Sequence, residues 1–419
     1  MQAAINPSAT LDLGGLRIGR TLFLKLENAL LVMSGGEILD IAVDSADFRH
    51  DIESWCMAKG HRLSAVLDGG DHARVLIAKG GSDHFAHKAD WGITLPQDEN
   101  GVVRIADWLI GKTGEIAPKA PAYFGLMPRG AAQETGSPEY PFSLNFKEQI
   151  WSKPIAKLYE EAKSSQWNAS TDIRWHELPK LPDFMEKAIC QIMTYMAENE
   201  FSALYIPGKF ISKINPYYME VVLFLATLIA DEARHIEAFI KRAMANGGGL
   251  QYSSAITQRS LYSLFIEEDY LKTSFLLHIL GEGTFLDLLT FLEEYAPDEV
   301  TKSIVTLAKR DETRHVAYGL AHVKANLTHN SGKIAALKDA VFKRKAYMDE
   351  LSGESTLLIE ALAIVAGGAD RGEGFKLGLS AVDRLKDKMH KNRIKRLIEV
   401  GVDEATAIEI STVHTPNFM

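Results

Sequence analysis

Two segments of the chain repeat the residue types that can bind a metal ion together. Residues 231–235 read Asp-Glu-Ala-Arg-His, and residues 311–315 read Asp-Glu-Thr-Arg-His. On a helix, Glu and His three positions apart lie on one face about a turn from each other, so each pair can hold one ion. Two copies that also share the Asp and the Arg are hard to obtain by chance. The repeat therefore predicts a site for two metal ions in a helical bundle.

Each Glu-His pair needs one more carboxylate, which we expect about thirty residues upstream because two antiparallel helices and a turn must bring it level. Glu282 stands thirty residues before Glu312, among apolar residues where an acid is costly unless it is paired or metal-bound. Glu200 stands thirty-two residues before Glu232. Glu198 is the alternative ligand on this helix. We prefer Glu200, because its distance along the chain from Glu232 is closer to the distance between Glu282 and Glu312.

The predicted site has an inner and an outer set of residues. The predicted ligands are Glu200, Glu232, His235, Glu282, Glu312 and His315. Four carboxylates offset two divalent ions, and this mixture of oxygen and imidazole suits iron or manganese, without excluding zinc. Around them, we expect Asp231 and Asp311 to accept the second ring N–H of the histidines, with Arg234 and Arg314 pairing with the aspartates.

The substrate pocket is expected beside the metal pair. Its predicted lining is Phe201, Phe239, Leu228, Phe275 and Leu204, each of which could equally be core. No cluster of basic residues stands near the ligand motifs, so the sequence contains no sign of a phosphate or sulfate on the substrate. His278, four residues before Glu282, is the one further histidine on that predicted helix.

The elements that must position these residues are helices. From residue 146 onward, apolar residues recur at helical spacing, and Asn215-Pro216 and Pro297-Asp298-Glu299 are typical helix starts. Gly247-Gly248-Gly249 is a typical helix end. The predicted helices cover residues 148–165, 181–205, 216–246, 255–295, 297–327, 333–365 and 372–412.

The first eighty residues instead alternate short strand and helix patterns. Strands are predicted at 11–16, 37–43, 61–67 and 72–78, and helices at 21–33 and 46–59. The order is β-α-β-α-β-β. The predicted fold class is therefore α+β and multidomain, a small sandwich followed by a mostly α bundle with C-terminal helices.

This N-terminal stretch resembles the TusA/SirA-like sulfur-carrier family. The resemblance rests on Gly15-Leu16-Arg17, Gly36-Glu37, the region of Cys56, and the closing segment 76–81. The family places Cys-Pro-x-Pro at the start of its first helix, where the helix dipole lowers the thiol pKa. This chain has Ile-Gly-Arg-Thr at 18–21, so the resemblance implies a partner-binding or regulatory role without persulfide chemistry. Cys56 is a poor substitute because its neighbours suggest a packed helix.

Residues 146–330 resemble the ferritin-like diiron oxidase/oxygenase superfamily, which includes the small subunit of ribonucleotide reductase and the p-aminobenzoate N-oxygenase type. Residues 166–168 and 173–175 also resemble the segment that leads into such bundles. The resemblance implies two iron ions, with manganese as the alternative, and dioxygen binding between them. The reductase has a radical tyrosine four residues after its first ligating histidine. Here that position is Phe239, which favours the oxygenase and oxidase branch.

Composition limits the remaining possibilities. The 419-residue chain has a net charge of −9, 46% hydrophobic residues and two cysteines with no metal-binding spacing. These values predict a soluble cytoplasmic protein without a disulfide framework, a nucleic-acid partner or a membrane span, and leave a homodimer open. We see no signal peptide. The predicted domains are 1–81, a linker arm 82–145 that packs on a neighbour, the bundle 146–330 and a helical extension 331–419.

The expected function is that of an enzyme, a diiron-dependent oxidoreductase. It would use dioxygen and an external electron donor to hydroxylate a C–H bond, oxygenate an amine or oxidise a small organic molecule. The alternative is a ferroxidase or metal-binding protein whose N-terminal domain recruits a partner. Radical generation for another subunit is a third hypothesis.

Overall fold

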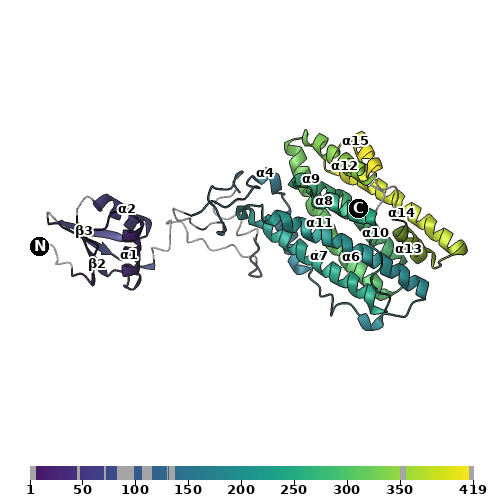
Figure 1. Cartoon of the computed structure of the whole chain (residues 1–419), viewed down its shortest axis with the longest axis horizontal. Coiled ribbons are helices and arrows are strands. Elements are labelled where there is room, and N and C mark those ends of the chain that lie inside the picture. The colour runs from purple at the N-terminus through teal and green to yellow at the C-terminus, as the bar shows by residue number, and fades with distance from the viewer. Residues whose placement is uncertain are drawn as a thin grey trace. The chain divides into compact units, whose positions relative to one another are not determined.

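The computed structural model describes residues 6–44, 48–69, 72–82, 99–105, 116–129, 131, 137–349 and 355–414. The chain forms two compact units, Met1–Thr94 and Leu95–Met419. Figure 1 shows a strand-and-helix unit at the N-terminus and a much larger helical unit. The predicted fold class is confirmed, whereas the finer division into four parts stays a prediction.

The first unit has the predicted order of elements. Its bounds are β1 Ala9–Asp12, α1 Arg20–Leu31, β2 Ile38–Val43, α2 Arg49–Ala58, β3 Arg62–Asp68 and β4 Ala73–Ala78. The sheet order is β1-β2-β4-β3, in which β1 and β2 are parallel and the other pairs antiparallel. Leu22, Leu26 and Leu30 repeat every four residues along α1 and are fully buried against the sheet.

The residues on which a sulfur-carrier role would depend are placed in this unit. Gly19 precedes α1, so residues 18–21 do stand at a helix N-terminus, but none of them is a cysteine. Cys56 is buried on α2, and burial, aided by Glu53, raises the pKa of its thiol to about 12. The resemblance to sulfur carriers therefore stays a prediction about shape and partners.

The described part of the linker arm lies against the helices of the second unit. Arg129 pairs with the buried Glu220, 2.6 Å away. The Tyr217 hydroxyl accepts the amide N–H of Ala117 at 3.0 Å. Leu144 forms a bridge to Ile214. Residues 116–129 and 137–145 therefore pack on the bundle, whereas the role of 82–145 as a linker arm stays a prediction.

The bundle is built from long helices joined by short turns. Its elements are α4 Lys147–Ile150, α5 Ile155–Ser164, η3 Trp175–Glu177, α6 Asp183–Ile211, η4 Pro216–Tyr218, α7 Met219–Ala245, α8 Ala255–Phe265, α9 Tyr270–Ser274, η5 Phe275–Glu282, α10 Gly283–Tyr295 and α11 Glu299–His329. The asparagine and aspartate predicted to begin α7 and α11 do act as caps, because Asn215 accepts the N–H of Tyr217 and Asp298 that of Thr301. Figure 1 shows α6 and α7 side by side, with α10 and α11 as a second pair.

Two of the helices predicted within residues 146–330 are wrong in their continuity. Residues 148–165 break before Pro154, because proline cannot continue the hydrogen bonding of a preceding turn. Residues 255–295 break between α8 and α9, where Asp269 caps a new helix by accepting the N–H of Lys272. Within the segment that follows Asp269, η5 is a π-helix, a wider helical turn that is frequent at functional sites.

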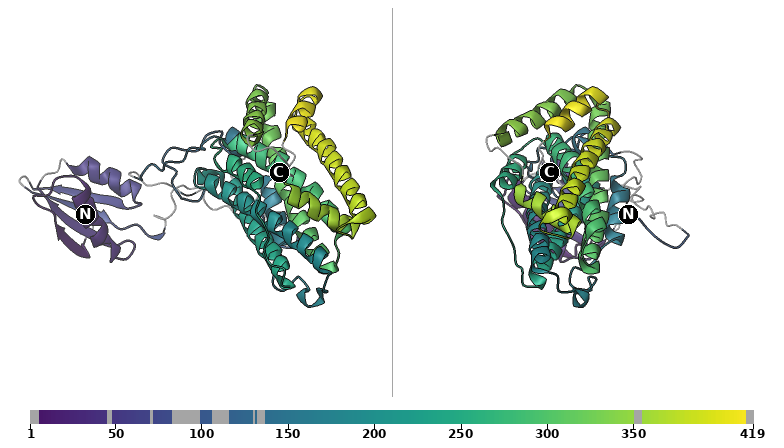
Figure 2. Two further views of the ribbon diagram at one scale, coloured as in Figure 1. Left: turned by 45° about the vertical axis from the view of Figure 1, so that its right-hand side comes forward. Right: turned by 90° about the vertical axis from the view of Figure 1, so that its right-hand side faces the viewer.

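The C-terminal helices extend the same compact unit. They are α12 Lys333–Asp349, α13 Thr356–Gly367, α14 Gly372–Glu399 and α15 Glu404–Val413, so the predicted helix 372–412 is interrupted at residues 400–403. Gly378 of α14 faces α13 closely, since a Cβ there would lie 1.9 Å from the carbonyl oxygen of Ala363. In Figures 1 and 2 the long helix α14 runs along the outside of the bundle, and it contacts α10 and α13.

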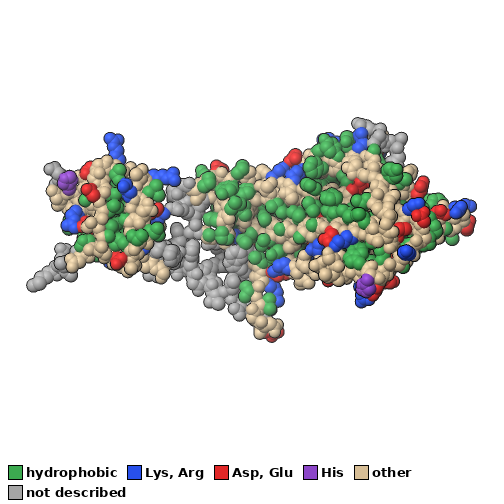
Figure 3. Space-filling model, turned by 60° about the horizontal axis from the view of Figure 1, so that its bottom comes forward, with side chains coloured by type: hydrophobic (Ala, Val, Ile, Leu, Met, Phe, Trp, Pro, Cys, Tyr) green, Lys and Arg blue, Asp and Glu red, His purple; other side chains and the backbone are tan. Residues whose placement is uncertain are grey.

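Within the described residues, one stretch, Tyr270–Tyr295, has the length and composition of a membrane-crossing helix. In the most apolar 18-residue segment of this stretch, 89% is buried inside the protein, as expected for the central helix of a bundle. Figure 3 shows one face, on which hydrophobic side chains cover a broad area of the helical unit with charged ones between them. The exposed hydrophobic residues of the bundle include Phe201, Tyr205, Tyr262, Phe265 and Ile266.

Candidate metal centre

Four helical segments bring six predicted residues together in the middle of the bundle. Glu200 comes from α6, Glu232 and His235 from α7, Glu282 from the last position of η5, and the second Glu-His pair from α11. All six side chains are buried, with residue exposures of at most 3%. They form two overlapping groups that could each hold a metal ion, and within each group the ligand atoms lie within 4.8 Å of one another.

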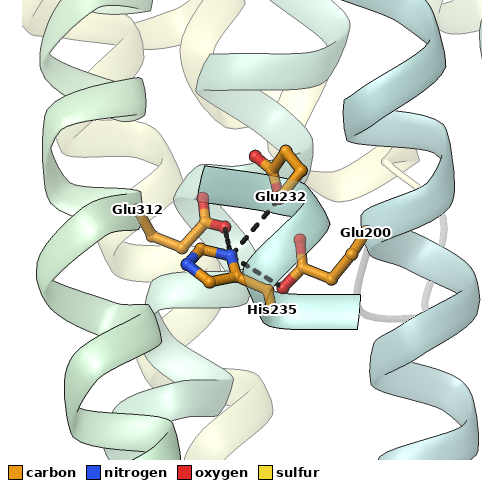
Figure 4. A group of neighbouring side chains, drawn as sticks. All are labelled: Glu200, Glu232, His235 and Glu312. Carbon is orange, nitrogen blue, oxygen red and sulfur yellow. Dashed lines mark ion pairs between the residues drawn. The ribbon is translucent and has the colours of Figure 1, made fainter. Parts of the chain in front are cut away.

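The first group surrounds the Nδ1 atom of His235. Glu232 Oε2 lies 3.3 Å from it, Glu312 Oε1 lies 3.4 Å away and Glu200 Oε1 lies 3.5 Å away. Figure 4 shows the three carboxylates converging on this ring nitrogen from three different helices. One nitrogen and three oxygens thus face a common point.

The second group surrounds the Nδ1 atom of His315. Glu232 Oε1 lies 3.0 Å from this atom and Glu312 Oε2 lies 3.4 Å from it. Glu282 completes the group. Glu232 and Glu312 therefore turn one oxygen to each histidine and are shared by both groups, whereas Glu200 and Glu282 each belong to one group.

The polar atoms at the centre lack hydrogen-bond partners although they are buried. This holds for both carboxylate oxygens of Glu232 and of Glu312, for Oε1 of Glu200 and of Glu282, and for Nδ1 of His235 and of His315. Buried polar groups are otherwise almost always hydrogen-bonded, and leaving so many unpartnered is costly. Two divalent cations would satisfy these atoms, because four carboxylates and two imidazoles are suitable ligands for them.

The repeated aspartates act across the two motifs. Asp311 Oδ2 lies 3.4 Å from Nε2 of His235, and Asp231 Oδ2 lies 3.2 Å from Nε2 of His315. A carboxylate on Nε2 favours a proton there and leaves the Nδ1 lone pair directed at the centre. Each aspartate thus orients the histidine of the other motif, a pairing that spacing along one helix could not reveal.

Arginines and two further side chains hold these aspartates. Arg314 Nη2 donates to Asp311 at 2.7 Å and to Asp231 at 3.0 Å, and Arg234 also bonds Asp231. The Trp167 indole N–H donates to Asp311 at 2.6 Å, and the Gln166 amide donates to Asp231 at 3.2 Å. Sequence reasoning had included Gln166 and Trp167 only in a resembling segment, without this role.

Electrostatics in the centre follow from burial and crowding. Burial raises the pKa of Glu200 well above its usual range, and repulsion from Glu232 and Glu312 adds to this. Burial also raises the pKa of Glu282. Burial opposes the charged form of His235, but the attraction of Glu200 and the bond to Asp311 outweigh it and raise the pKa of the imidazole well above its usual value. In the metal-free centre, protons on these groups thus supply part of the positive charge that would balance the carboxylates.

The two candidates for the carboxylate on α6 are placed differently. Glu200 points into the centre, as described above. Glu198 lies half-buried and accepts hydrogen bonds from Ser253 and from Gln258, the latter at 2.9 Å. Two positions on a helix are about 200° apart around its axis, so only one of these glutamates can face the bundle interior.

The predicted pocket residues separate into two sets. Phe201 is 45% exposed, because it follows Glu200 by about 100° around α6, so the prediction that it lines the centre is wrong. Phe239 is fully buried, with its ring centroid 6.4 Å from that of His235. Leu228 and Phe275 are fully buried in the hydrophobic core, and Leu204 is half-buried.

A buried polar chain leads away from Glu282. His278 Nδ1 lies 2.6 Å from Glu282 Oε2, and the His278 ring meets that of Tyr318 edge-on at 5.4 Å. The Tyr318 hydroxyl bonds that of Tyr270. Tyr318 also stacks on His322, whose ring centroid is 5.7 Å away. His278 therefore contacts the outer carboxylate of Glu282 and links it to two buried tyrosines.

Comparisons with known proteins find solved structures that are similar to this chain in fold. No protein-family model matches the chain, and no curated protein matches it. Among solved structures, a point mutant of an R2-like ligand-binding oxidase with an aerobically reconstituted Mn/Fe cofactor matches with 16% identity and a TM-score of 0.48, covering 61% of this chain and 95% of its own. An R2-like ligand-binding oxidase with an aerobically reconstituted metal cofactor after photoconversion matches with 18% identity and a TM-score of 0.42 at the same coverage. So distant a likeness carries no conclusion about chemistry.

The fold and the site of this chain define its class by themselves. It is a ferritin-like helical bundle whose centre can hold two metal ions between two shared and two outer carboxylates.

Proposed function

We propose that the chain is a dioxygen-dependent oxidoreductase with two iron ions, or manganese in place of iron, in the bundle centre. The observation that supports this most directly is the set of eight buried, unpartnered ligand atoms that converge from four helices. Glu200 and His235 would hold one ion, Glu282 and His315 the other, and Glu232 and Glu312 would bridge them. Their four negative charges offset two divalent cations.

A redox-active metal pair bound there would supply electrons for the reduction of dioxygen. The chain's own contribution is to fix the ligands and to exclude water. Asp231 and Asp311 keep a proton on the Nε2 atoms, so both histidines present Nδ1 as a neutral donor. Arg234 and Arg314 hold the aspartates in place, and Phe239 closes the centre beside His235.

The reaction proposed is oxidation of a small organic molecule, either by C–H hydroxylation or by oxygenation of an amine. Reducing equivalents would come from an external donor. The N-terminal unit, whose helix start lacks the sulfur-carrier cysteine, would serve to recruit a partner.

Metal loading with a matched pair of variants tests the proposal. The full chain should bind about two Fe(II) per chain under anaerobic conditions, and air should then change its optical spectrum. Glu200→Gln should lose at least one of the two ions, because it replaces a charged ligand by a neutral one. Glu198→Gln, two residues away on the same helix, should retain both, because Glu198 bonds Ser253 and Gln258 instead.

The reaction class is tested by exposing the Fe(II) form to dioxygen with candidate amines and hydrocarbons and reading mass shifts. A gain of one oxygen atom in any of them supports an oxygenase. Less than one iron per chain, with no optical change in air, would refute the proposal. Iron uptake and oxidation without any change in organic molecules would favour a ferroxidase.

A further inference from the structure

Three arginines and a histidine are buried together beside α10. Arg344 lies on α12, Arg393 and Arg396 on α14, and His414 directly after α15. Arg344, Arg393 and His414 are 5%, 6% and 7% exposed, and the side chain of Arg396 is 12% exposed. The expectation that no basic cluster stands near the ligands is therefore wrong, because these residues are distant in sequence and meet only in the fold.

Each of these side chains has a buried nitrogen without a partner. The unpartnered atoms are Nη1 of Arg344, Nε of Arg393, Nε and Nη2 of Arg396, and Nε2 of His414. Arg242 provides the contrast within the same bundle. Its guanidinium is equally buried, but it bonds Thr301 and Glu186 and pairs with Asp298. Arg234 and Arg314 also leave Nε without a partner, but among the buried arginines that the structure describes, terminal guanidinium nitrogens are unpartnered only in Arg344 and Arg396 of this cluster.

The cluster has too few acids for its positive charge. Asp287 is the one carboxylate, among the residues that the structure describes, within ion-pair distance of any of the three arginines, 3.7 Å from Arg396. Arg344 bonds the hydroxyls of Ser260 and Ser263. Within the described part of the chain, Arg393 bonds the hydroxyls of Ser411 and Thr284 and the carbonyl of Ser411, and no carboxylate.

These arginines stay charged at neutral pH despite their surroundings. Burial, with repulsion from Arg396, lowers the pKa of Arg393 to about 9. Burial lowers the pKa of Arg344 to about 10. The site therefore holds two more positive charges than it has acids to balance, and buried charge without compensation is unfavourable.

The cluster borders the metal centre next to Glu282, one of its two outer carboxylates. Arg396 packs against Gly283, where a Cβ would lie 2.5 Å from its Nε atom, and Gly283 directly follows Glu282. Arg393 Nη2 donates to Thr284 at 3.2 Å. Arg344 lies close enough to Tyr195 to affect the pKa of its hydroxyl, and Tyr195 stands on α6 about one and a half turns before Glu200. Figure 1 shows α12, α14 and α15 on one side of the bundle, and of these helices α14 contacts α10.

We propose that Arg344, Arg393, Arg396 and His414 bind the oxyanionic head group of the substrate, a carboxylate or a phosphate. The head group would accept the unpartnered N–H groups and balance the excess charge, and the rest of the molecule would extend toward the metal centre. Guanidinium groups suit both oxyanions because their planar donors match paired oxygens. This inference names the substrate class of the proposed oxidoreductase and rests on that function, but the binding site itself is independent of the metals.

Binding is measured with the metal-free full chain and three probes that share one tail: octanoate, octyl phosphate and octanol. Octanoate or octyl phosphate should bind and raise Tm, whereas octanol should bind at least about 10-fold more weakly. Arg393→Gln and Arg344→Gln should each weaken binding of the anion by about 10- to 100-fold. Without a ligand, both variants should be at least as stable as the parent chain. Arg242→Gln should lower Tm and leave anion affinity unchanged.

Several results would overturn the inference. One is equal binding of octanol and the anions, and another is unchanged anion affinity in both arginine variants. A chain that ends at His414 provides a third test: if this change alone raises anion affinity more than about 10-fold, the chain itself occupies the site and the substrate assignment fails. Anion binding without oxygen-dependent chemistry in the iron-loaded protein would refute the proposed function and leave the binding site standing.

Discussion

Replacing Glu200 by glutamine separates a metal ligand from an ordinary buried glutamate. Glu200 is 2% exposed, and its Oε1 atom has no hydrogen-bond partner. Burial raises the pKa of this carboxyl well above its usual range, because the charged form is disfavoured in the metal-free protein. Glutamine has the same shape and no charge. We therefore expect Glu200→Gln to change the free energy of unfolding of the metal-free protein by less than about 1 kcal/mol.

Glu220 is the matched control. It is 1% exposed, like Glu200, but Arg129 pairs with it at 2.6 Å. Removing one partner of a buried ion pair is strongly destabilising and costs about 3–5 kcal/mol. Glu220→Gln should therefore destabilise the metal-free protein strongly and leave metal binding unchanged.

Metal binding should raise the Tm of Glu200→Gln less than that of Glu220→Gln, although Glu200→Gln is the more stable variant without metal. At a metal concentration about 1,000 times Kd, binding stabilises the folded chain by about 4.1 kcal/mol. At about 2–4 °C per kcal/mol for a unit of this size, the rise in Tm is about 8–16 °C. A 100-fold weaker site retains only about 1.4 kcal/mol, so Glu200→Gln should show a rise of about 3–6 °C.

The assay is thermal unfolding followed by circular dichroism, in anaerobic buffer with and without Fe(II) or Mn(II). An equal metal-dependent rise in the parent chain and in Glu200→Gln would show that Glu200 is not a ligand. Destabilisation of the metal-free Glu200→Gln protein to the level of Glu220→Gln would show that the carboxylate has a partner, contrary to the geometry on which the metal site rests.

Three further predictions concern the surroundings of the centre. Asp311→Asn should weaken metal binding by about 10- to 100-fold, read by competition with a chelator, because the amide no longer fixes the histidine that it contacts. Gly319→Ala should destabilise the protein by about 1–3 kcal/mol in denaturant unfolding, because the new Cβ would lie 2.2 Å from the Cβ of His278. Cys56 and Cys190 should resist alkylation at about pH 8 until the protein unfolds, because burial raises their thiol pKa values to about 12 and about 11.

Each of these has a control or a contradicting result. Asp403→Asn should leave metal affinity unchanged, since Asp403 caps α15 at the surface by accepting the N–H of Thr406. Gly208→Ala should be tolerated, because a Cβ there meets its nearest neighbour, Ile229, at an ordinary 3.9 Å. Equal destabilisation by the two alanine variants would contradict the close approach of α11 to η5. Rapid alkylation of either cysteine in the native protein would contradict its burial.

Much of the fold followed from local patterns. Helix caps at Asn215 and Asp298 and a glycine turn at 247–249 set helix ends that the structure confirms. Apolar periodicity predicted the order of the elements in the first unit, with the largest error at the first strand, which was predicted at 11–16 and is found at Ala9–Asp12. It failed at residues 255–295, because an apolar run with helical spacing continues through the turn before Asp269, and only the cap at that residue ends one helix and begins another.

The two Glu-His pairs and their upstream glutamates were determined by the sequence alone. Helical spacing fixes which residues share a face, and helix length fixes where an antiparallel neighbour returns, so Glu200 and Glu282 could be predicted from distance along the chain. Only the tertiary structure decided how the two halves combine. Asp231 orients His315 and Asp311 orients His235, and Arg393 and Arg396 of a later helix meet Thr284 and Gly283. Contacts of this kind depend on how separate helices pack against one another, which periodicity along a single helix does not specify.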